Sequence, residues 1–201
     1  MKTIIFATSN NNKMREIREI LGDAPVEVLS MKEAGFSPDI DENGSSFEEN
    51  AMIKAKAVVS LCKEAFPDAI AIADDSGLEV DYLDKAPGIY SARFLGEDTS
   101  YDIKNNYIID KLKGVPDEKR TARFVCAMAA VATDAREAVV RGTVEGIIGY
   151  KQAGENGFGY DPIFFLPERG CTTAELPPDE KNAISHRGRA LREIKKIIEN
   201  W

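Results

Sequence analysis

Apolar residues along this chain of 201 residues fall into short runs and into faces spaced three or four residues apart. Two short apolar runs, at 3–7 and 26–29, predict buried strands. Between them one helix face is apolar, with Met14, Ile17 and Leu21 at helical spacing. The chain is therefore expected to begin as a strand, a polar loop, a helix and a second strand.

A second helix is predicted by its start signal. Residues 32–45 read as an irregular acidic loop, and Ser46 and Glu49 then have the spacing of a capping box. We expect a helix of roughly five turns from there to Ala65. Its buried stripe is predicted to consist of Ala51, Ala55, Val58, Leu61, Cys62 and Ala65.

The apolar run 70–73 is followed by two carboxylates, a hydroxyl and a glycine, in the order Asp74-Asp75-Ser76-Gly77. The run predicts a short buried strand that ends at the two aspartates, with 78–82 as its hairpin partner. Adjacent carboxylates repel each other, so the pair favours a nearby cation, and a hard metal ion prefers oxygen ligands. The alternative is a plain turn, since Asp, Ser and Gly all favour turns.

The second half of the chain predicts a hairpin between two helices. A polar helix capped by Asp98 or Thr99 comes before it, and Ser185 is a candidate N-cap for the last helix. Residues 120–133 and 137–150 alternate like two long antiparallel strands joined by a short turn. Strand–helix units together with a hairpin indicate an α/β fold with a long mixed sheet and helices on both faces.

Composition fits one soluble domain over 1–201, with room for two lobes, because 43% of the residues are hydrophobic and 30% are charged. The net charge of −8 argues against broad binding to nucleic acid. Three scattered cysteines and one histidine argue against a Cys/His zinc site and fit a reduced cytoplasmic compartment. The N-terminus is apolar only briefly, so we expect neither a signal peptide nor a membrane span.

The loop after the first strand has the order expected of a phosphate site. It runs from Thr8 to Asn12, and Lys13 opens the helix that follows. A helix start exposes N–H groups and the positive end of the helix dipole, which suits phosphate. The loop lacks the glycines of a Walker motif, and the alternative is an ordinary capped helix.

The remaining polar segments match the needs of a nucleoside triphosphate. Such a ligand needs cations for its phosphates, carboxylates for Mg²⁺, an aromatic face for its base and donors for the edge of that base. The candidates are Lys13, Glu42, Asp74, Asp75, Phe158, Tyr160, Asp161, Lys181, His186 and Arg187. A single histidine in a basic segment makes Ser-His-Asp or Cys-His chemistry a poor alternative.

Six motifs, in order along the chain, resemble those of one known family. They are Thr8-Ser-Asn-x-x-Lys13, Phe47-x-Glu-Asn-Ala-x-x-Lys54-Ala, Ala73-Asp-Asp-Ser-Gly-Leu78, Ala86-Pro-Gly-Ile-Tyr-Ser-Ala-Arg93, Gly157-Phe-Gly-Tyr-Asp-Pro-Ile-Phe164 and Lys181-x-Ala-Ile-Ser-His-Arg187-Gly. They resemble the inosine triphosphatase or Ham1-like family, which are pyrophosphatases for non-standard purine nucleoside triphosphates. One departure is Ser9, where bacterial members usually carry glycine.

The resemblance implies an elongated α/β fold with a long mixed sheet and two lobes around a central cleft. It also implies a Mg²⁺-dependent homodimer in the cytoplasm. That enzyme would hydrolyse the purine nucleoside triphosphates ITP, dITP and XTP to the monophosphate and pyrophosphate, which cleanses the nucleotide pool. Neither nucleic acid nor a membrane is an expected partner.

The same resemblance implies a role for each site residue. Asp75 would accept a proton, and the metal ligands would be Glu42, Asp74 and Asp75. The phosphates would be held by Thr8, Ser9, Asn10, Asn11, Asn12, Lys13 and Lys54. The rest of the substrate would be held by Ser76, Phe158, Gly159, Tyr160, Asp161, Lys181, His186 and Arg187.

Two alternatives stay open. The first is another nucleotide pyrophosphatase of related fold, such as the Maf type, which acts on other bases. The second is a nucleotide-binding module without turnover, although such a module has less need of paired metal carboxylates. If the family reading holds, Arg187 would choose the base. It has only donors, so it can bond the O6 atom of hypoxanthine or xanthine but not the amino group of adenine.

Overall fold

A computed structural model describes residues 2–22 and 26–201 of the chain. Contacts between residues divide the chain into two compact units, which are described separately. The first unit consists of Met1–Asp75, Cys126–Gly142 and Arg187–Trp201, and the second of Ser76–Val125 and Thr143–His186. These two units agree with the two lobes that were expected, and the cleft expected between the lobes stays a prediction.

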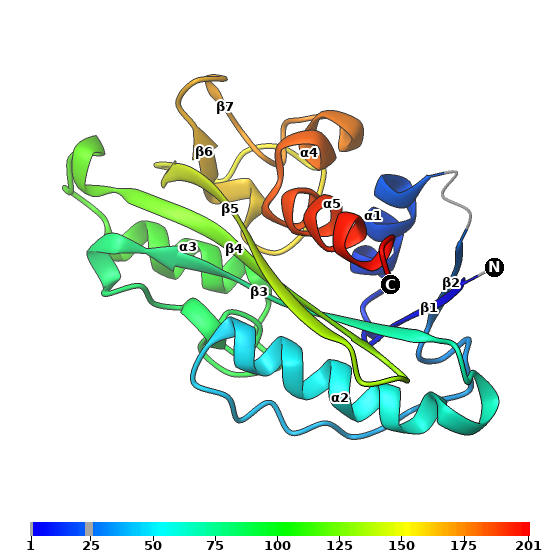
Figure 1. The fold of residues 1–201 in the computed structure, drawn as a ribbon. Coiled ribbons are helices and arrows are strands. Elements are labelled where there is room, and N and C mark those ends of the chain that lie inside the picture. Colours follow the sequence, from blue (N-terminus) through cyan, green and yellow to red (C-terminus); the bar gives the residue numbers. More distant parts are fainter. Residues whose placement is uncertain (1, 23–25) are drawn as a thin grey trace. The chain divides into compact units, whose positions relative to one another are not determined.

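The described strands form one mixed sheet of seven strands, in the order β2-β1-β3-β4-β5-β6-β7 (Figure 1). β1 pairs in parallel with β2 and β3, whereas β6 pairs antiparallel with β5 and β7. The bounds are β1 Lys2–Phe6, β2 Val26–Ser30, β3 Ile70–Val80, β4 Thr121–Ala132, β5 Glu137–Ile148, β6 Phe164–Leu166 and β7 Cys171–Thr172. The predicted α/β class with a mixed sheet is thereby confirmed.

Five α-helices are described, and the start signals read from the sequence are right for α2 and wrong for α3. They are α1 Asn11–Leu21, α2 Phe47–Ala65, α3 Tyr101–Lys111, α4 Pro178–Ile184 and α5 His186–Ile198. Ser46 caps α2 and accepts the N–H of Glu49, as the capping box predicts. α3 is capped by Ser100 and not by Asp98 or Thr99, because the helix begins later than expected.

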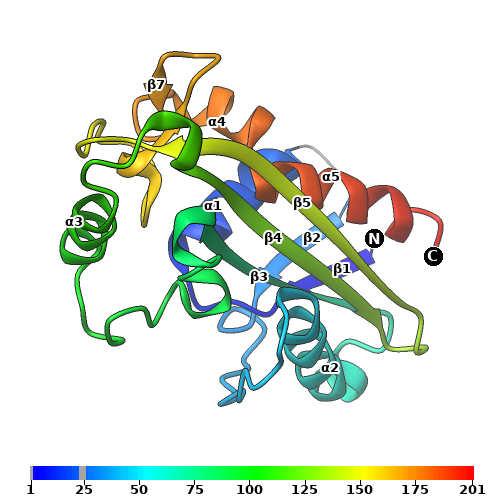
Figure 2. The same cartoon turned by 90° about the vertical axis from the view of Figure 1, so that its left-hand side faces the viewer.

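In the first unit, helices cover both faces of the strands. α2 lies on one face, and α1 and α5 lie on the other (Figures 1 and 2). Side chains alternate along each strand, so one set faces α1 and α5. That set packs into one core with the apolar faces of the two helices. Its strand residues include Ile4, Phe6, Ile70, Ile72, Cys126, Met128 and Ala130, and Leu191 and Ile194 of α5 pack with them.

The predicted stripe of α2 is largely right. Ala51, Ala55, Val58 and Cys62 are fully buried. Leu61 is 43% exposed, and Ala65 is exposed as well, so these two predictions are wrong. Leu61 comes directly before the fully buried Cys62 and so lies about 100° away from it around the helix, and Ala65 is the last residue of the helix.

The second unit has its own apolar core. Ile108 and Leu112, at the C-terminal end of α3, pack there with residues of β3, β4 and β5. Arg120 is 1% exposed beside this core and donates to the backbone oxygens of Leu112, Ile148 and Gly149. These hydrogen bonds let a buried guanidinium join the end of α3 to the end of β5.

The strand predicted to end at Asp74-Asp75 continues instead. β3 runs through both aspartates to Val80, and Leu78 and Val80 are fully buried. The hairpin partner predicted at 78–82 is therefore wrong, as is the plain turn. The strand can continue because, as shown below, each aspartate has its own partners and the two side chains point to opposite faces.

No helix within residues 2–22 and 26–201 combines the length and the apolar character that a bilayer span requires.

The hairpin predicted between 120–133 and 137–150 is confirmed. β4 and β5 are neighbours in the sheet, and the N–H of Ala132 donates to the backbone oxygen of Arg136 across the turn.

Candidate active site

The start of α1 lies beside the middle of β3. The parallel pairing of β1 with β3 ends at Phe6 and Ile72, and the N–H of Ala7 still donates to the oxygen of Ile72. β3 then continues to Asp74, whereas the segment after β1 leaves the sheet and enters α1. The carboxyl end of a parallel strand next to a helix N-terminus is the place where α/β folds commonly bind ligands.

The loop before α1 is built as a capped helix start. The Asn10 side chain accepts the N–H groups of Asn12 (2.9 Å) and Lys13 (3.2 Å), and Thr8 Oγ1 accepts the N–H of Asn10 (3.1 Å). The capped helix offered as an alternative is therefore present. The side chains from Ser9 to Asn12 are exposed, so this loop still offers polar groups to a phosphate.

Asp74 lies beneath α1 and α5. It is on the same strand face as Ile72, and it is 2% exposed. Lys13 Nζ is 3.1 Å and 3.0 Å from its two carboxylate oxygens, and Arg187 Nη2 is 3.2 Å from Oδ2. Burial by itself would raise the pKa of Asp74. The positive charges of Lys13, Arg187 and Lys54 outweigh burial and hold the pKa well below its usual value.

Arg187, the second residue of α5, is 2% exposed and also pairs with Glu16 of α1 through Nη1. Glu16 is 6% exposed, so both partners of this ion pair are buried. The guanidinium thus joins α1, β3 and α5. Arg187 was predicted from the sequence, but Glu16 was not. Glu16 comes directly before Ile17 and so lies about 100° away from it around the helix, which places it off the apolar face of α1 in the sequence pattern.

Asp75 points to the opposite face, beneath α2. Asn50 Nδ2 donates to Oδ2 of Asp75 at 3.0 Å, and Lys54 Nζ lies 3.9 Å from Oδ1. Asp75 is 8% exposed, and burial raises its pKa despite the opposing effects of Lys54 and Asn50. A carboxylate with a raised pKa is a better proton acceptor, so Asp75 is suited to act as a base.

Lys54 brings a second carboxylate to the same place. Its Nζ is 2.7 Å from Glu42 Oε2, and the Lys54 side chain is 10% exposed. Lys54 therefore points at the acidic loop and not into solvent. Asn50 and Lys54 are one turn apart on α2, so one helix face contacts both Asp75 and the Glu42 loop.

The side chains of the two adjacent aspartates therefore point to opposite faces of β3, and their role as metal ligands stays a prediction. Strand alternation separates their side chains, so Asp74 forms ion pairs with Lys13 and Arg187, and Asp75 lies nearest to Lys54. Among the described residues, no group of three or more His, Cys, Asp and Glu side chains converges as in a metal site made by protein alone. Glu42 and Asp75 are the carboxylates that share one cation, the Lys54 ammonium.

Asp161 organises the predicted nucleoside loop within the second unit. Its Oδ2 accepts a hydrogen bond from the N–H of Phe158 (2.8 Å) and forms an ion pair with Lys181 Nζ (2.7 Å). Its Oδ1 accepts a hydrogen bond from the hydroxyl of Thr173 (2.9 Å). Lys181 Nζ also lies 5.1 Å from the centre of the Phe158 ring. The structure therefore brings Phe158, Asp161 and Lys181 together, as one binding surface would require.

The other predicted residues of the second unit are Tyr160, Gly159, His186 and Ser76, and the first three contact other parts of this unit. Tyr160 is 3% exposed and donates its hydroxyl to the backbone oxygen of Ser91 (2.8 Å). The backbone oxygen of Gly159 accepts from Asn105 (3.1 Å). The ring of His186 stacks on Phe124 with centroids 4.8 Å apart. Ser76 follows Asp75 within β3 and is half-buried.

Gly157→Ala is expected to disturb this loop more than an ordinary glycine substitution. Gly157 has φ +74°, and a Cβ atom there would lie 2.2 Å from Asp161 Oδ2. The left-handed backbone alone costs roughly 1–2 kcal/mol. Gly170→Ala is the control, because its φ is +66° and no atom lies within 4 Å of the added Cβ. Urea unfolding should show a lower free energy of unfolding for both variants. KM for ITP should rise only for Gly157→Ala, and equal KM values would contradict a substrate role for this loop.

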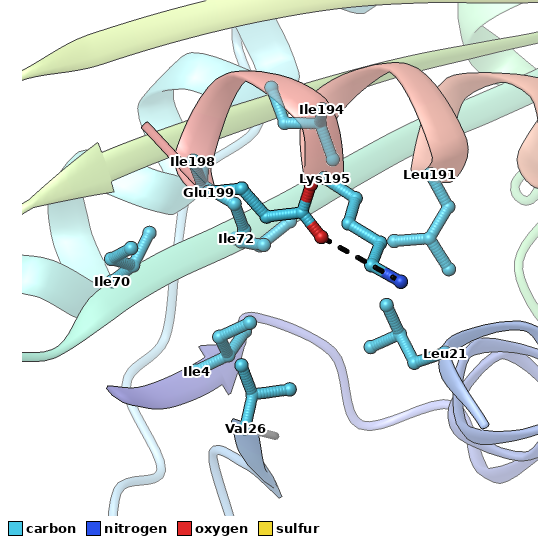
Figure 3. Close-up of a pocket in the computed structure, with 10 residues that line it drawn as sticks. All are labelled: Ile4, Leu21, Val26, Ile70, Ile72, Leu191, Ile194, Lys195, Ile198 and Glu199. Atoms are coloured by element: carbon cyan, nitrogen blue, oxygen red, sulfur yellow. Dashed lines mark ion pairs between the residues drawn. The ribbon is translucent and has the colours of Figure 1, made fainter. Parts of the chain in front are cut away.

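An apolar cavity of about 290 Å³ lies elsewhere in the first unit, between α5 and the strands β1 and β3 (Figure 3). Isoleucine and leucine side chains make most of its wall, and Lys195 and Glu199 pair with each other beside it (3.8 Å). A triphosphate needs several cations and donors. This cavity therefore does not suit the predicted nucleotide, whereas the polar residues around Asp74 and Asp75 do.

Comparison with known proteins supports the family. The model of the Ham1 family matches residues 4–197. A dITP/XTP pyrophosphatase of Clostridium perfringens is 47% identical over 196 residues, which are 97% of this chain and 96% of the relative. The solved structure of a HAM1 protein from Coxiella burnetii has a TM-score of 0.86 at 37% identity, with 100% of both chains covered. The Staphylococcus aureus Ham1 protein has the same TM-score and identity, with 98% of both chains covered. The chain belongs to the Ham1 family.

Proposed function

We propose that this protein is a nucleoside triphosphate pyrophosphatase that hydrolyses ITP, dITP and XTP to the monophosphate and pyrophosphate. The relative from Clostridium perfringens, with which 97% of the chain aligns, is a dITP/XTP pyrophosphatase. The observation that supports the chemistry best is the surrounding of Asp75. A buried carboxylate with a raised pKa lies beside Lys54 and near a second carboxylate, Glu42.

The reaction needs a positioned water, charge neutralisation and a proton acceptor. The water oxygen forms a bond to one phosphorus of the bridge between the α and β phosphates, and the bond from the bridging oxygen to that phosphorus breaks. Asp75 takes the proton that the water loses. Lys13 and Lys54 stabilise the negative charge that develops on the phosphate oxygens.

The residues present fit Mg²⁺ as a cofactor. Mg²⁺ is usually bound by one or two carboxylates together with substrate phosphates rather than by a site made of protein alone. Glu42 and Asp75 match this pattern, because both already approach one positive charge, the Lys54 ammonium. Asp74 is the weaker ligand candidate, since Lys13 and Arg187 surround it. When bound, Mg²⁺ would polarise the phosphates and lower the pKa of a coordinated water.

The remaining assignments extend this proposal. In the loop from Thr8 to Lys13, the exposed side chains from Ser9 to Asn12 would hold phosphates together with the less exposed Thr8 and Lys13. Phe158, Asp161, Lys181 and His186 would hold the nucleoside, and Ser76 would contact the substrate. We also propose that the protein works as a homodimer in the cytoplasm, with one family domain over the whole chain.

Pyrophosphate release with and without Mg²⁺ tests the proposal. A panel of ITP, dITP, XTP, ATP, GTP, CTP and UTP should show rapid release from the first three, only with Mg²⁺. Preference for CTP or UTP would favour a pyrophosphatase that acts on other bases, such as the Maf type, instead. Tight binding of ITP without any release would favour the binding module.

A further inference from the structure

We infer that Asn50 is a positioning residue that fixes the Asp75 carboxylate and joins it to the loop carrying Glu42. This inference rests on the proposed hydrolysis, because it assigns the atom of Asp75 that takes the proton. None of the roles implied by the family resemblance falls on Asn50.

The side-chain amide of Asn50 is used at both ends. Nδ2 donates to Asp75 Oδ2 at 3.0 Å, and Oδ1 accepts the backbone N–H of Gly44 at 2.8 Å. Asn50 is 1% exposed, so neither bond competes with bulk water. Turning the amide over would set its oxygen against a carboxylate and its NH₂ group against an N–H group, so the two partners fix its orientation.

The Glu42 loop is held very close to α2 at this point. A Cβ atom at Gly44 would lie 2.7 Å from Asn50 Oδ1 and 2.8 Å from Glu49 Cβ. Only glycine allows this approach without displacing the loop or the helix. Glu49 holds the same loop from the neighbouring position, because its carboxylate accepts the N–H (2.7 Å) and the hydroxyl (2.8 Å) of Ser45.

Asn50 determines which oxygen of Asp75 reacts. Its hydrogen bond uses one lone pair of Oδ2 and makes this oxygen the less basic of the two, while Lys54 faces Oδ1 at 3.9 Å, which is too long for a hydrogen bond. The proton of the attacking water therefore goes to Oδ1. The bond to Asn50 also prevents rotation of the carboxylate, which would otherwise move its reactive oxygen away from the water.

The kinetic test compares Asn50→Leu and Asn50→Asp with Glu49→Leu. Both Asn50 variants remove the donor to Asp75, but Asn50→Asp keeps an acceptor for Gly44. Glu49→Leu weakens the hold on the loop and leaves the Asn50–Asp75 bond intact. We expect kcat for ITP to fall roughly 10- to 100-fold in both Asn50 variants, with KM changed less than about threefold. In Glu49→Leu, kcat should stay within about twofold of wild type.

A second readout needs neither metal nor substrate. Asn50→Leu should lower the midpoint of urea unfolding in the wild-type background and lower it less in an Asp75→Ala background, where the bond is already absent. Equal shifts in both backgrounds, or unchanged kcat in the two Asn50 variants, would overturn the inference. So would an equal loss of kcat in Glu49→Leu, which would assign the effect to loop anchoring. A wild-type protein that does not hydrolyse ITP would instead refute the proposed function and leave the unfolding test valid.

Discussion

Asp75→Asn is expected to lower the turnover of ITP by at least about 10²-fold at saturating Mg²⁺. The substitution keeps the shape of the side chain but removes the proposed proton acceptor and one proposed carboxylate ligand of Mg²⁺. Asp39→Asn, in the exposed part of the acidic loop, makes the same change of charge and is the control. Near wild-type turnover in Asp75→Asn would refute the assignment of Asp75 as the base.

The same variant should not lose stability at neutral pH, which separates lost chemistry from lost folding. The pKa of Asp75 is raised in the folded state by burial. The folded protein therefore binds the carboxyl proton more tightly than the unfolded chain does. Wild-type protein loses stability as the pH rises through the folded pKa, because the buried carboxyl then has to ionise. Asparagine has no charge to bury. Relative to wild type, Asp75→Asn should gain stability as the pH rises above about 3.9, the ordinary pKa of aspartate. Urea unfolding at pH 4 and pH 8 measures the difference.

Local patterns in the sequence predicted the local structure well. The Ser46–Glu49 capping box and the apolar faces of α1 and α2 depend on residues within a few turns of each other. They could therefore be read without knowing the fold. The motifs also identified the family, because their order along the whole chain is specific.

The faces of Asp74 and Asp75 could not be predicted in the same way. Two aspartates after an apolar run look like a strand end, and only the partners on each side show why the strand continues. Those partners come from distant segments. Asn50 is 25 residues from Asp75, and Arg187 is 113 residues from Asp74. Asn50 is part of one of the six motifs, but the sequence alone assigned it no contact with Asp75.

Arg187→Met is expected to lower the free energy of unfolding by about 3–5 kcal/mol, because it leaves two buried carboxylates without a cation between them. Lys13 still pairs with Asp74, so Glu16 is the carboxylate left in the poorer environment. Removing its charge as well, in Arg187→Met/Glu16→Leu, should recover part of the loss. Arg15→Met is the matched control, because Arg15 pairs with Glu19 at 4.0 Å on the exposed side of α1. That pair should contribute less than about 1 kcal/mol.

The Arg187 variants also test whether this residue reads the base. The guanidinium nitrogens of Arg187 donate to Asp74 and Glu16, which favours a role in holding α1, β3 and α5 together. If Arg187 only holds this network, the folded double variant Arg187→Met/Glu16→Leu should lose kcat/KM for ITP and ATP in the same proportion. If it donates to O6 of the purine, the loss for ITP should exceed that for ATP by roughly 10- to 100-fold, which corresponds to one buried donor facing the wrong partner.

Glu16→Gln, which keeps the arginine, should leave the ratio of kcat/KM for ITP to kcat/KM for ATP near the wild-type value in both cases. A ratio that falls in Glu16→Gln as much as in the double variant would mean that the network, and not a donor from Arg187, sets the choice of base.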